Sequence, residues 1–525
     1  MARRGCRRMR AVSAIPAVVQ GRCTAKALRR RLSRPVVARA TPIRLSDAGD
    51  EKRLCRWGAG EARCTIRRSM IRQEAATMSK PASPRKIIPP GVWPTPAQGW
   101  YAVAALTFAH FVSYLDRTII SLLVEPIKAS QQLSDTQVSF LLGFAFAVFY
   151  ALAGIPLGYL ADRSRRKRLI LASIGIWSLM TAACGLAKGF WGLFLARVGV
   201  GVGEAGLNPA AISLISDCFP PRKRHFPVAT FMVGGTLGGG LAIILGAGLV
   251  SLGERLTFTP LPLLGILEPW QWVFVLVSLL GLPALLLAAG VREPARKGLL
   301  QASDSGAAVN AYLRRHWRCL AGLFVGTSLI LMVNVCYLVW GPTLFVRVHG
   351  LTLQQAGLMV GLPCFVAGIA GNFVAPAIAR RLGRGGRQDA PLLTIQLVAL
   401  LVALPMVLGP LLPTPLAVIA TVAPAIGLMV GSASVVQIAA QQILPNQLRA
   451  RAVAFYNLAV NALAFGLGPL LIGLLSDRLY ADEKLLHYSI ATLALAAIPL
   501  ALLVLARTRR HFLAAAADAR DWSPT

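Results

Sequence analysis

Four ionisable residues lie inside long apolar segments of this 525-residue chain. Asp116 and Arg117 are neighbours within "HFVSYLDRTIISLL" (110–123), and Arg197 and Glu204 share a second apolar segment. A charged side chain at the centre of a bilayer costs at least about 2.5–3.5 kcal/mol, so such residues usually face a partner or an aqueous cavity. Carboxyl groups in this setting can carry protons, and guanidinium groups can hold an anion.

Asp116 and Arg117 cannot face the same spot, because neighbours on a helix point about 100° apart. We expect both side chains to reach the edge of an aqueous cavity. Asp116 would take up a proton there, and Arg117 would hold a substrate anion. The alternative is a structural ion pair that joins the first apolar segment to the fourth.

Arg197 and Glu204 are seven residues apart, so they share a helix face at about 10 Å along the axis. Desolvation disfavours the charged form of a carboxyl group, and Glu204 can therefore exchange a proton near neutral pH. We expect Arg197 to change partners between Asp116 and Glu204. A static buried network is the alternative, although buried ion pairs often contribute little net stability.

Six further residues are weaker candidates for a cavity lining. His110 precedes Arg117 by seven residues on the same helix face and titrates near neutral pH, but a lone histidine is more often a hydrogen-bonded core group. The other five carry amide or aromatic groups, for which interhelical hydrogen bonds or packing are the alternatives; they are Asn334, Tyr337, Trp340, Asn457 and Asn461. Asn457 and Asn461 lie at i and i+4, on one face.

Motifs of catalysis and metal binding are missing from the sequence. It contains no GxSxG, no HExxH and no Walker-type phosphate loop. Its nine cysteines include no CxxC and no paired Cys/His cluster. We therefore expect no enzymatic activity, no cofactor, no metal and no structural disulfide. Any transport would take its energy from an ion gradient or from the gradient of the substrate itself.

The composition predicts an all-α membrane protein. The chain is 55% hydrophobic and 14% charged, whereas soluble domains carry about 25% charged residues. Apolar runs of about the 20 residues needed to cross a bilayer recur after Trp100. The twelve expected spans lie near 101–125, 136–160, 169–187, 190–217, 226–251, 270–291, 319–345, 352–378, 390–411, 415–442, 450–476 and 486–507.

The formal net charge of +34 has two sources. Of the 55 Lys and Arg residues, 20 lie in the first 77 positions, and the rest form short clusters between apolar runs. Alternate connections carry these clusters, which is the positive-inside pattern of a membrane protein rather than the basic surface of a nucleic-acid-binding one. The basic connections, and with them both termini, should be cytoplasmic; they are 163–168, 222–225, 292–318, 380–387, 448–451 and 507–511.

An internal repeat divides the expected spans six and six. A shift of about 218 residues lays "ADRSRRKR" (161–168) over "ARRLGRGG" (379–386), and parallel six-span halves are one known transporter layout. The expected parts are an N-terminal extension (1–77), a cytoplasmic lead (78–100), an N-terminal bundle (101–291), a connecting loop (292–318), a C-terminal bundle (319–508) and a cytoplasmic tail (509–525).

Residues 1–77 are rich in arginine, and no stretch among them is long and apolar enough to span a bilayer. Three interpretations compete. A transit peptide fits poorly with the acids at positions 47, 50, 51 and 61, and a disordered arm could touch anionic lipid. The third and favoured one is upstream sequence translated from a start codon assigned too early, with Met78 as the true start.

Several motifs together resemble those of the major facilitator superfamily. "GYLADRSRRKRLI" (158–170) resembles its signature loop between spans two and three, except that Arg165 stands where the family usually has glycine. "SYLDR" in span one and "RVGVGVGEAGLNPAAISLISDCFP" (197–220) resemble the spinster-like branch. So do "RAVAFYNLAVNALAFGLGPLLIGLLSD" (451–477) and the set Trp340, Pro342 and Arg347. The resemblance covers about 101–508.

This resemblance implies a secondary transporter with two six-helix bundles, a central cavity and alternating access. Spinster-like members are linked to lysophospholipids, sphingoid phosphates and similar amphiphilic anions. Asp162 is implied to latch the two halves on the cytoplasmic side near the start of span eleven, and Arg166 to pair with Asp217 in the same gate. Arg380 takes the place of Asp162 in the second half, so the latch is not duplicated.

We therefore expect a monomeric, multi-pass protein of the cell (inner) membrane that moves an amphiphilic or organic anion, coupled to protons and surrounded by membrane lipids. The alternatives are an exporter of hydrophobic drugs, an importer of small organic acids and a membrane receptor that no longer transports. Span five (226–251) has many glycines but no internal Gly-Pro motif, which weakens the drug-exporter alternative.

Overall fold

The computed structural model describes residues 93–256, 266–296, 306–444 and 449–521. The expected N-terminal extension (1–77) and most of the lead (78–100) lie outside these residues. Within them, every regular element is a helix, as the sequence predicts.

The first half contains six membrane-crossing units. The first begins at Pro96, where Thr95 caps the helix and exchanges hydrogen bonds with Gln98 in a capping box. Several units are divided by irregular turns, so that two helices make one crossing. In chain order the helices are α2 (Pro96–Ile119), α3 (Val124–Gln131), α4 (Asp135–Ser139), α5 (Ala145–Arg163), α6 (Arg166–Leu186), α7 (Phe190–Glu204), α8 (Leu207–Cys218), α9 (His225–Leu256), α10 (Pro269–Leu279) and α11 (Gly281–Gly290).

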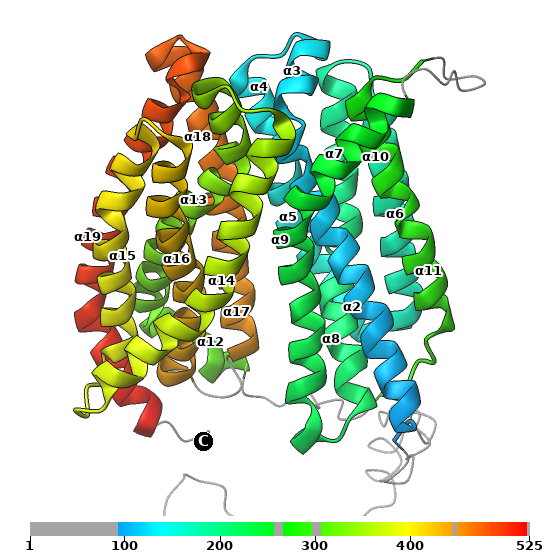
Figure 1. Cartoon of the computed structure of the whole chain (residues 1–525). Coiled ribbons are helices and arrows are strands. Elements are labelled where there is room, and N and C mark those ends of the chain that lie inside the picture. Colours follow the sequence, from blue (N-terminus) through cyan, green and yellow to red (C-terminus); the bar gives the residue numbers. More distant parts are fainter. Residues whose placement is uncertain (1–92, 257–265, 297–305, 445–448, 522–525) are drawn as a thin grey trace, which may run out of the picture. The chain divides into compact units, whose positions relative to one another are not determined.

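The second half repeats the arrangement. Its helices are α13 (Trp317–His349), α14 (Leu353–Gly383), α15 (Ala390–Leu408), α16 (Pro415–Ile443), α17 (Arg449–Ala459), α18 (Gly468–Leu474) and α19 (Leu486–Asp521). Two π-helical segments, η6 (Val460–Leu467) and η7 (Leu475–Tyr480), flank α18 in the same crossing. The two groups of helices lie side by side, with α9 and α14 next to each other (Figure 1).

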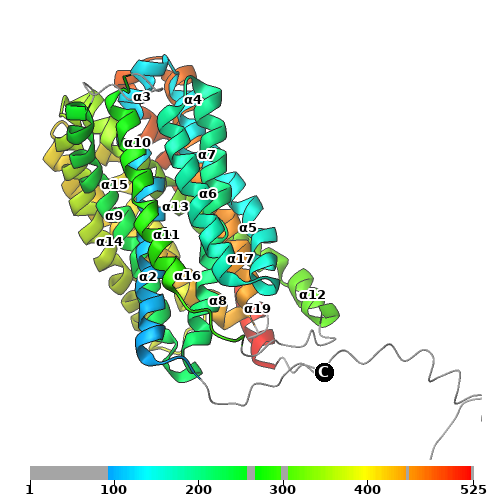
Figure 2. The same ribbon diagram turned by 90° about the vertical axis from the view of Figure 1, so that its right-hand side faces the viewer.

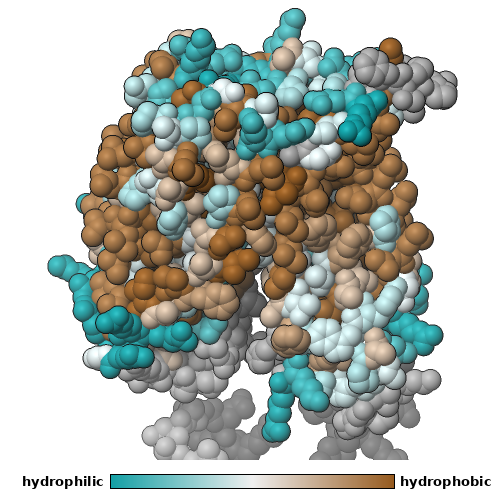
Figure 3. Space-filling view, in the orientation of Figure 1, coloured by the Kyte–Doolittle hydropathy of each residue, from teal (hydrophilic) through white to brown (hydrophobic). Residues whose placement is uncertain are grey.

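Eleven helical segments of the described residues are long and apolar enough to cross a membrane. They correspond to expected spans two to twelve. The first crossing, α2, is less apolar than these because His110, Asp116 and Arg117 lie within it. A belt of hydrophobic side chains separates two hydrophilic ends on the face shown in Figure 3. The all-α fold with twelve membrane helices is therefore as predicted.

Two segments differ from the sequence-based expectation. The connecting loop (292–318) contains the helix α12 (Gly306–Arg315), and α19 continues to Asp521, beyond residue 508 where we expected the C-terminal bundle to end. Both extra segments pack together: the Tyr312 hydroxyl oxygen lies 3.4 Å from the carbonyl oxygen of Ala515, and Phe512 is fully buried. Mutual burial stabilises helices that hydropathy alone would assign to loops.

Glycines on α7 bring three helices of the first half close together. A Cβ atom at Gly201 would lie 2.6 Å from the carbonyl oxygen of Phe146 on α5, and one at Gly203 would lie 2.7 Å from the backbone nitrogen of Trp177 on α6. Neither neighbour is the end of a flexible side chain, so only glycine fits at these positions.

Gly201→Ala is expected to destabilise the protein by about 1–3 kcal/mol, the usual cost of overpacking, because α5 must move away from α7. The measurement is the thermal unfolding midpoint of the purified protein in detergent. Gly175→Ala on α6 is the matched control, since a Cβ there meets nothing within 4 Å. Equal midpoints for the two variants would contradict this account of the α5–α7 contact.

One end of the helix bundle carries three arginine-rich segments (163–168, 380–387 and 507–511), and we name it the arginine-rich end. The other is the opposite end. In Figure 3 the surface is hollowed between the two halves at the arginine-rich end, at the bottom of the view. No hydrogen bond or ion pair between described residues joins the two halves at that end, whereas several do at the opposite end.

Candidate functional site

The four intramembrane charges do meet, as two pairs between α2 and α7. Arg117 Nη2 lies 3.2 Å from Glu204 Oε2, and Arg197 Nη1 lies 3.9 Å from Asp116 Oδ1. Asp116, Arg197 and Glu204 are each at most 1% exposed. We name these four residues the central charge cluster. Two carboxyls and two guanidinium groups share one apolar region, in which each charge depends strongly on the others.

Aromatic rings surround the Arg117 guanidinium group. Its central carbon lies 4.8 Å from the ring centre of Tyr114, 4.3 Å from that of Phe146 and 4.7 Å from that of Tyr150. Cation–π contacts of this kind stabilise a desolvated cation by roughly 2 kcal/mol. Phe146 also lies 5.4 Å from Arg197, so one ring separates the two arginines.

Asp116 has a second partner that the sequence did not indicate, Thr181 on α6. The Thr181 hydroxyl contacts the Asp116 carboxyl group and lies 2.9 Å from the carbonyl oxygen of Trp177. A hydroxyl group has one hydrogen to donate. In this conformation the Thr181 hydroxyl can therefore donate fully to only one of the two oxygens, Asp116 Oδ2 or the Trp177 carbonyl oxygen.

The expected positions of the cluster are partly wrong. Asp116 is buried between helices and does not reach an aqueous edge, because Thr181 and Arg197 close around it. Arg117 retains 10% side-chain exposure. Arg197 pairs with Asp116 and not with Glu204 in this conformation, and none of its three nitrogen atoms makes a hydrogen bond with a described residue. A buried guanidinium group without hydrogen bonds is costly, which favours a set of partners that changes during function.

His110 lies apart from this cluster. Its ring stacks on Phe231 of α9 at 4.4 Å between ring centres, and its Nδ1 atom lies 3.0 Å from the Phe231 carbonyl oxygen. This is the hydrogen-bonded core position that we weighed as the alternative. His110 thus joins α2 to α9.

The weaker candidates on α13 are buried in this conformation. Asn334 is 4% exposed, Tyr337 is 3% exposed and Trp340 is fully buried, and the side-chain donor of each has no partner among the described residues. In the eleventh crossing, Asn461 Nδ2 donates to the carbonyl oxygen of Asn457 at 2.8 Å. The role of these residues in substrate binding stays a prediction.

Arg166 and Asp217 form the expected ion pair at the arginine-rich end. Arg166 is fully buried, and its backbone nitrogen donates to Glu293 Oε1 at 2.9 Å. Its Nη1 atom donates to the carbonyl oxygen of Ser213 at 3.1 Å, and its Nη2 atom to that of Pro294 at 3.0 Å. One side chain therefore ties α6, α8 and the segment after α11 together within the first half.

Arg166→Gln is expected to destabilise the protein by about 3–5 kcal/mol, because it leaves Asp217 and Glu293 without their cation in a largely buried setting. Thermal unfolding in detergent measures this loss. Arg168→Gln, an exposed arginine two residues away on the same helix, is the control and should unfold like the parent. A similar midpoint for both variants would show that the Arg166 contacts contribute little.

Asp162 is exposed and makes no hydrogen bond or ion pair with any described residue. The expected latch between the halves at the arginine-rich end is therefore not formed by described residues in this conformation. Arg380, its counterpart in the second half, is exposed as well. Neighbouring contacts are local, as where Arg296 Nη2 donates to the carbonyl oxygen of Ala161 at 2.7 Å.

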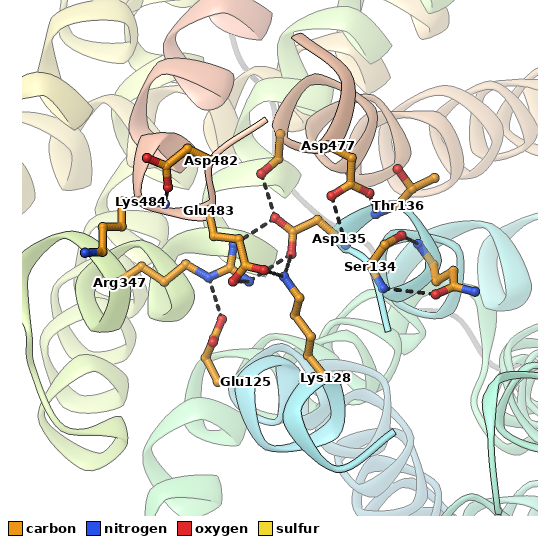
Figure 4. A network of polar contacts seen from close by, with 12 residues as sticks. Glu125, Lys128, Ser134, Asp135, Thr136, Arg347, Asp477, Asp482, Glu483 and Lys484 are labelled. Carbon is orange, nitrogen blue, oxygen red and sulfur yellow. Dashed lines mark hydrogen bonds and ion pairs between the residues drawn. The ribbon is translucent and has the colours of Figure 1, made fainter. Parts of the chain in front are cut away.

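A second charged set, which the sequence analysis missed, joins the two halves at the opposite end (Figure 4). Arg347 at the end of α13 donates from Nη1 and Nη2 to the two carboxylate oxygens of Asp135, each at 2.8 Å. Its Nε atom donates to Glu125 at 2.7 Å. Asp135 is fully buried, and Ser476 donates to it at 2.6 Å. Bidentate contacts of this kind are among the stronger ion pairs in proteins.

Further contacts of the same set cap α4 from the second half. The backbone nitrogen atoms of Asp135 and Thr136 donate to the Asp477 carboxylate at 3.2 and 2.7 Å, where the helix dipole favours a negative charge. Lys128 lies 2.6 Å from Asp135 and 2.5 Å from Glu483. We name Glu125, Lys128, Asp135, Arg347, Asp477 and Glu483 the opposite-end latch. The Trp340 ring lies 5.8 Å from the Arg347 guanidinium group.

The signal for this latch was present in the sequence but weak. Its members stand at the ends of the first, second, seventh, eleventh and twelfth crossings, where charged residues normally face water. Of these residues, only Arg347 belongs to a motif that resembles the spinster-like branch. Spacing along the chain does not show that residues about 200 positions apart will meet.

Comparison with known proteins gives the family context. The sequence profile described as Major Facilitator Superfamily matches residues 106–469. An MFS-type efflux pump of Mycolicibacterium smegmatis is 31% identical over 400 residues, which cover 74% of this chain and 86% of that protein. Human protein spinster homolog 1 is 28% identical, over 73% of this chain and 74% of that protein.

Solved structures agree with the sequence relatives. The crystal structure of a bacterial homologue of the human lysosomal transporter Spinster, in an inward-facing and unoccupied conformation, superposes with a TM-score of 0.69. Its sequence is 25% identical, and the match covers 82% of this chain and all of that one.

Proposed function

This chain belongs to the Major Facilitator Superfamily, within its spinster-like branch, and we propose that it is a proton-coupled transporter of an amphiphilic organic anion. The single observation that carries the proposal is the central charge cluster. It holds two arginines and two carboxyl groups in an apolar region, and every member lies on α2 or α7.

The surroundings of Arg117 fit an amphiphilic anion. The guanidinium group supplies a positive charge with five donors, and the Tyr114, Phe146 and Tyr150 rings supply apolar surface beside it. A substrate with an acidic head and an apolar body can use both. Binding requires Glu204 to release Arg117, and a proton on Glu204 would neutralise the carboxylate and favour that release.

Proton coupling follows from the two pairs. Asp116 has the Thr181 hydroxyl group and Arg197 as partners, and Glu204 accepts a hydrogen bond from Arg117. Transfer of a proton between the Asp116 and Glu204 carboxyl groups would change which arginine, Arg117 or Arg197, is free to bind an anion. Net movement of substrate would then carry a proton with it.

Alternating access is supported by the two ends of the bundle. In the conformation described, the opposite-end latch holds the halves together, and no such contact joins described residues of the two halves at the arginine-rich end. We propose that the arginine-rich end and both termini face the cytoplasm, that the protein lies in the cell (inner) membrane, and that it acts as a monomer. Asp162, Arg166 and Asp217 would then gate the cytoplasmic opening.

A second candidate is export of hydrophobic compounds, because the relative of Mycolicibacterium smegmatis is an MFS-type efflux pump. The aromatic surroundings of Arg117 would accept an apolar molecule. The two buried arginines favour an anion over the cations that many exporters carry. Small organic acids and a receptor that binds without transport are the remaining alternatives, and one experiment separates all four.

The test is substrate counterflow in proteoliposomes that contain residues 78–525. A panel of lysophospholipids, sphingoid phosphates, small organic acids and cationic drugs is preloaded in turn, and exchange of the same labelled compound is followed. We expect exchange with an anionic amphiphile and its loss in Arg117→Gln. Exchange with drugs alone would overturn the anion proposal, and binding without exchange would identify a receptor.

A further inference from the structure

The helices α12, α13 and α19 meet at the arginine-rich end, away from the central charge cluster. A cavity of about 340 Å³ lies there, lined by Arg315, Arg318, His316, His511, Trp317 and Asp518 among others. α12 and the last turns of α19 lie beside each other in this region (Figure 2). Neither the central charge cluster nor the opposite-end latch extends to it.

The cavity has an excess of positive charge. Arg315 and Arg318 contribute two guanidinium groups, and Asp518 is the one carboxylate among the residues that line it. Arg315 Nη2 lies 3.0 Å from Asp518, but its side chain is 73% exposed, so the guanidinium group can also reach another anion. His316 Nε2 also lies 3.3 Å from Asp518. Burial lowers the pKa of His316, so the two arginines are the main source of positive charge in the cavity.

The start of α13 lines the same cavity. α13 begins at Trp317, and its N-cap residue His316 makes no capping hydrogen bond through its side chain. The first amide groups of a helix lack intrahelical partners and favour an anion. Arg318 also lies 5.8 Å from the Trp317 ring, which is 58% exposed at the end of a membrane-crossing helix, where tryptophan typically meets lipid headgroups.

The wall of this cavity is held firmly in place. The Tyr312 hydroxyl donates to the carbonyl oxygen of Ile443 at 2.7 Å, which attaches α12 to the end of α16. Burial raises the pKa of Tyr312 to about 12, so the hydroxyl group remains a donor at neutral pH. This contact fixes the position of α12, whose last residue, Arg315, lines the cavity.

We propose that the cavity between α12, α13 and α19 binds a phosphate-bearing anion, held by Arg315, Arg318 and the first turn of α13. The source is either the headgroup of an anionic membrane lipid or a soluble phosphate, because both present the same chemistry. Basic pockets at the cytoplasmic ends of membrane helices have the charge and depth that such headgroups require. The site is separate from the transported substrate.

The experiment uses the purified full chain in detergent, titrated with dioctanoyl phosphatidylglycerol, dioctanoyl phosphatidylcholine or inorganic phosphate. Binding is followed by the shift in thermal unfolding midpoint. In the double variant Arg315→Gln/Arg318→Gln we expect the apparent affinity for phosphatidylglycerol to fall about fivefold per arginine, from the roughly 1 kcal/mol that each base near an anionic surface contributes. The control Arg314→Gln/Arg381→Gln removes two exposed arginines from the same end, outside the cavity.

A gain of affinity provides a test that misfolding cannot mimic. Asp518→Asn removes the carboxylate that competes for Arg315 and should tighten binding several-fold. Saturable stabilisation by phosphatidylglycerol alone identifies a headgroup, and equal stabilisation by inorganic phosphate identifies a soluble phosphate; both support the site. An equal loss in the two double variants, no binding of any probe, or no gain in Asp518→Asn would overturn it.

Discussion

Glu204→Gln is expected to abolish proton-driven uptake while leaving substrate exchange intact. The change preserves the volume of the side chain, and its amide oxygen can still accept the hydrogen bond that Arg117 donates at 3.2 Å. The variant can neither gain nor lose a proton at this position. Exchange requires no net proton release, whereas uptake driven by a proton gradient requires a proton to leave in every cycle.

Both activities can be measured in the same proteoliposomes, first with an imposed pH gradient and then with substrate on both sides. We expect gradient-driven uptake to fall by about 10²-fold or more, the usual effect of removing a group that transfers a proton. Glu254→Gln, which changes an exposed carboxylate at the end of α9, is the control and should behave like the parent. Gradient-driven uptake that survives in Glu204→Gln would show that this carboxyl group is structural.

Arg347→Gln should open the opposite end of the transporter. Arg347 is 5% exposed and contacts both carboxylate oxygens of fully buried Asp135. Losing one partner of a buried ion pair costs about 3–5 kcal/mol, and this cost applies only to the conformation in which the halves meet there. At about 1.4 kcal/mol per tenfold change, the equilibrium should shift by roughly 10² to 10³ toward the open form.

Distances between spin labels on the two halves measure this shift. One pair, at Lys188 and Pro413, spans the opposite end, and a second pair, at Arg168 and Arg384, spans the arginine-rich end; all four positions are exposed. The cysteines of residues 1–77 are replaced by serine so that they do not react. In Arg347→Gln the first distance should lengthen and the second should shorten.

Arg478→Gln supplies the matched control for this measurement. Arg478 is exposed at the same end and makes no ion pair with any described residue. Its distance distributions should equal those of the parent. If Arg347→Gln also leaves both distributions unchanged, the opposite-end latch does not determine which side of the transporter is open.

Much of the fold was predictable because membrane helices have a strong sequence signal. A bilayer demands about 20 apolar residues for each crossing, and the expected spans coincide with the helices observed. Charges inside those spans were equally informative, since burying Asp116, Arg117, Arg197 or Glu204 is costly unless they meet. The sequence therefore indicated which residues form the central charge cluster.

Other features depend on contacts that hydropathy does not report. Phe146 and Tyr150 resemble any other apolar residues of a span, and only the packing of α5 against α7 places them beside Arg117. The pairing of Arg197 with Asp116 depends on helix rotation, which the spacing of seven residues leaves open. Asp135 and Arg347 stand at span ends, where a solvated charge is the commoner outcome.

The most direct test of the central claim is proton movement in proteoliposomes that contain a pH-sensitive dye, started by adding the anionic amphiphile that exchanges in counterflow. We predict a pH change that depends on this substrate and disappears in both Asp116→Asn and Glu204→Gln. Substrate that crosses without a pH change, with both variants behaving like the parent, would contradict the claim and make the protein a facilitator whose buried carboxyl groups are structural.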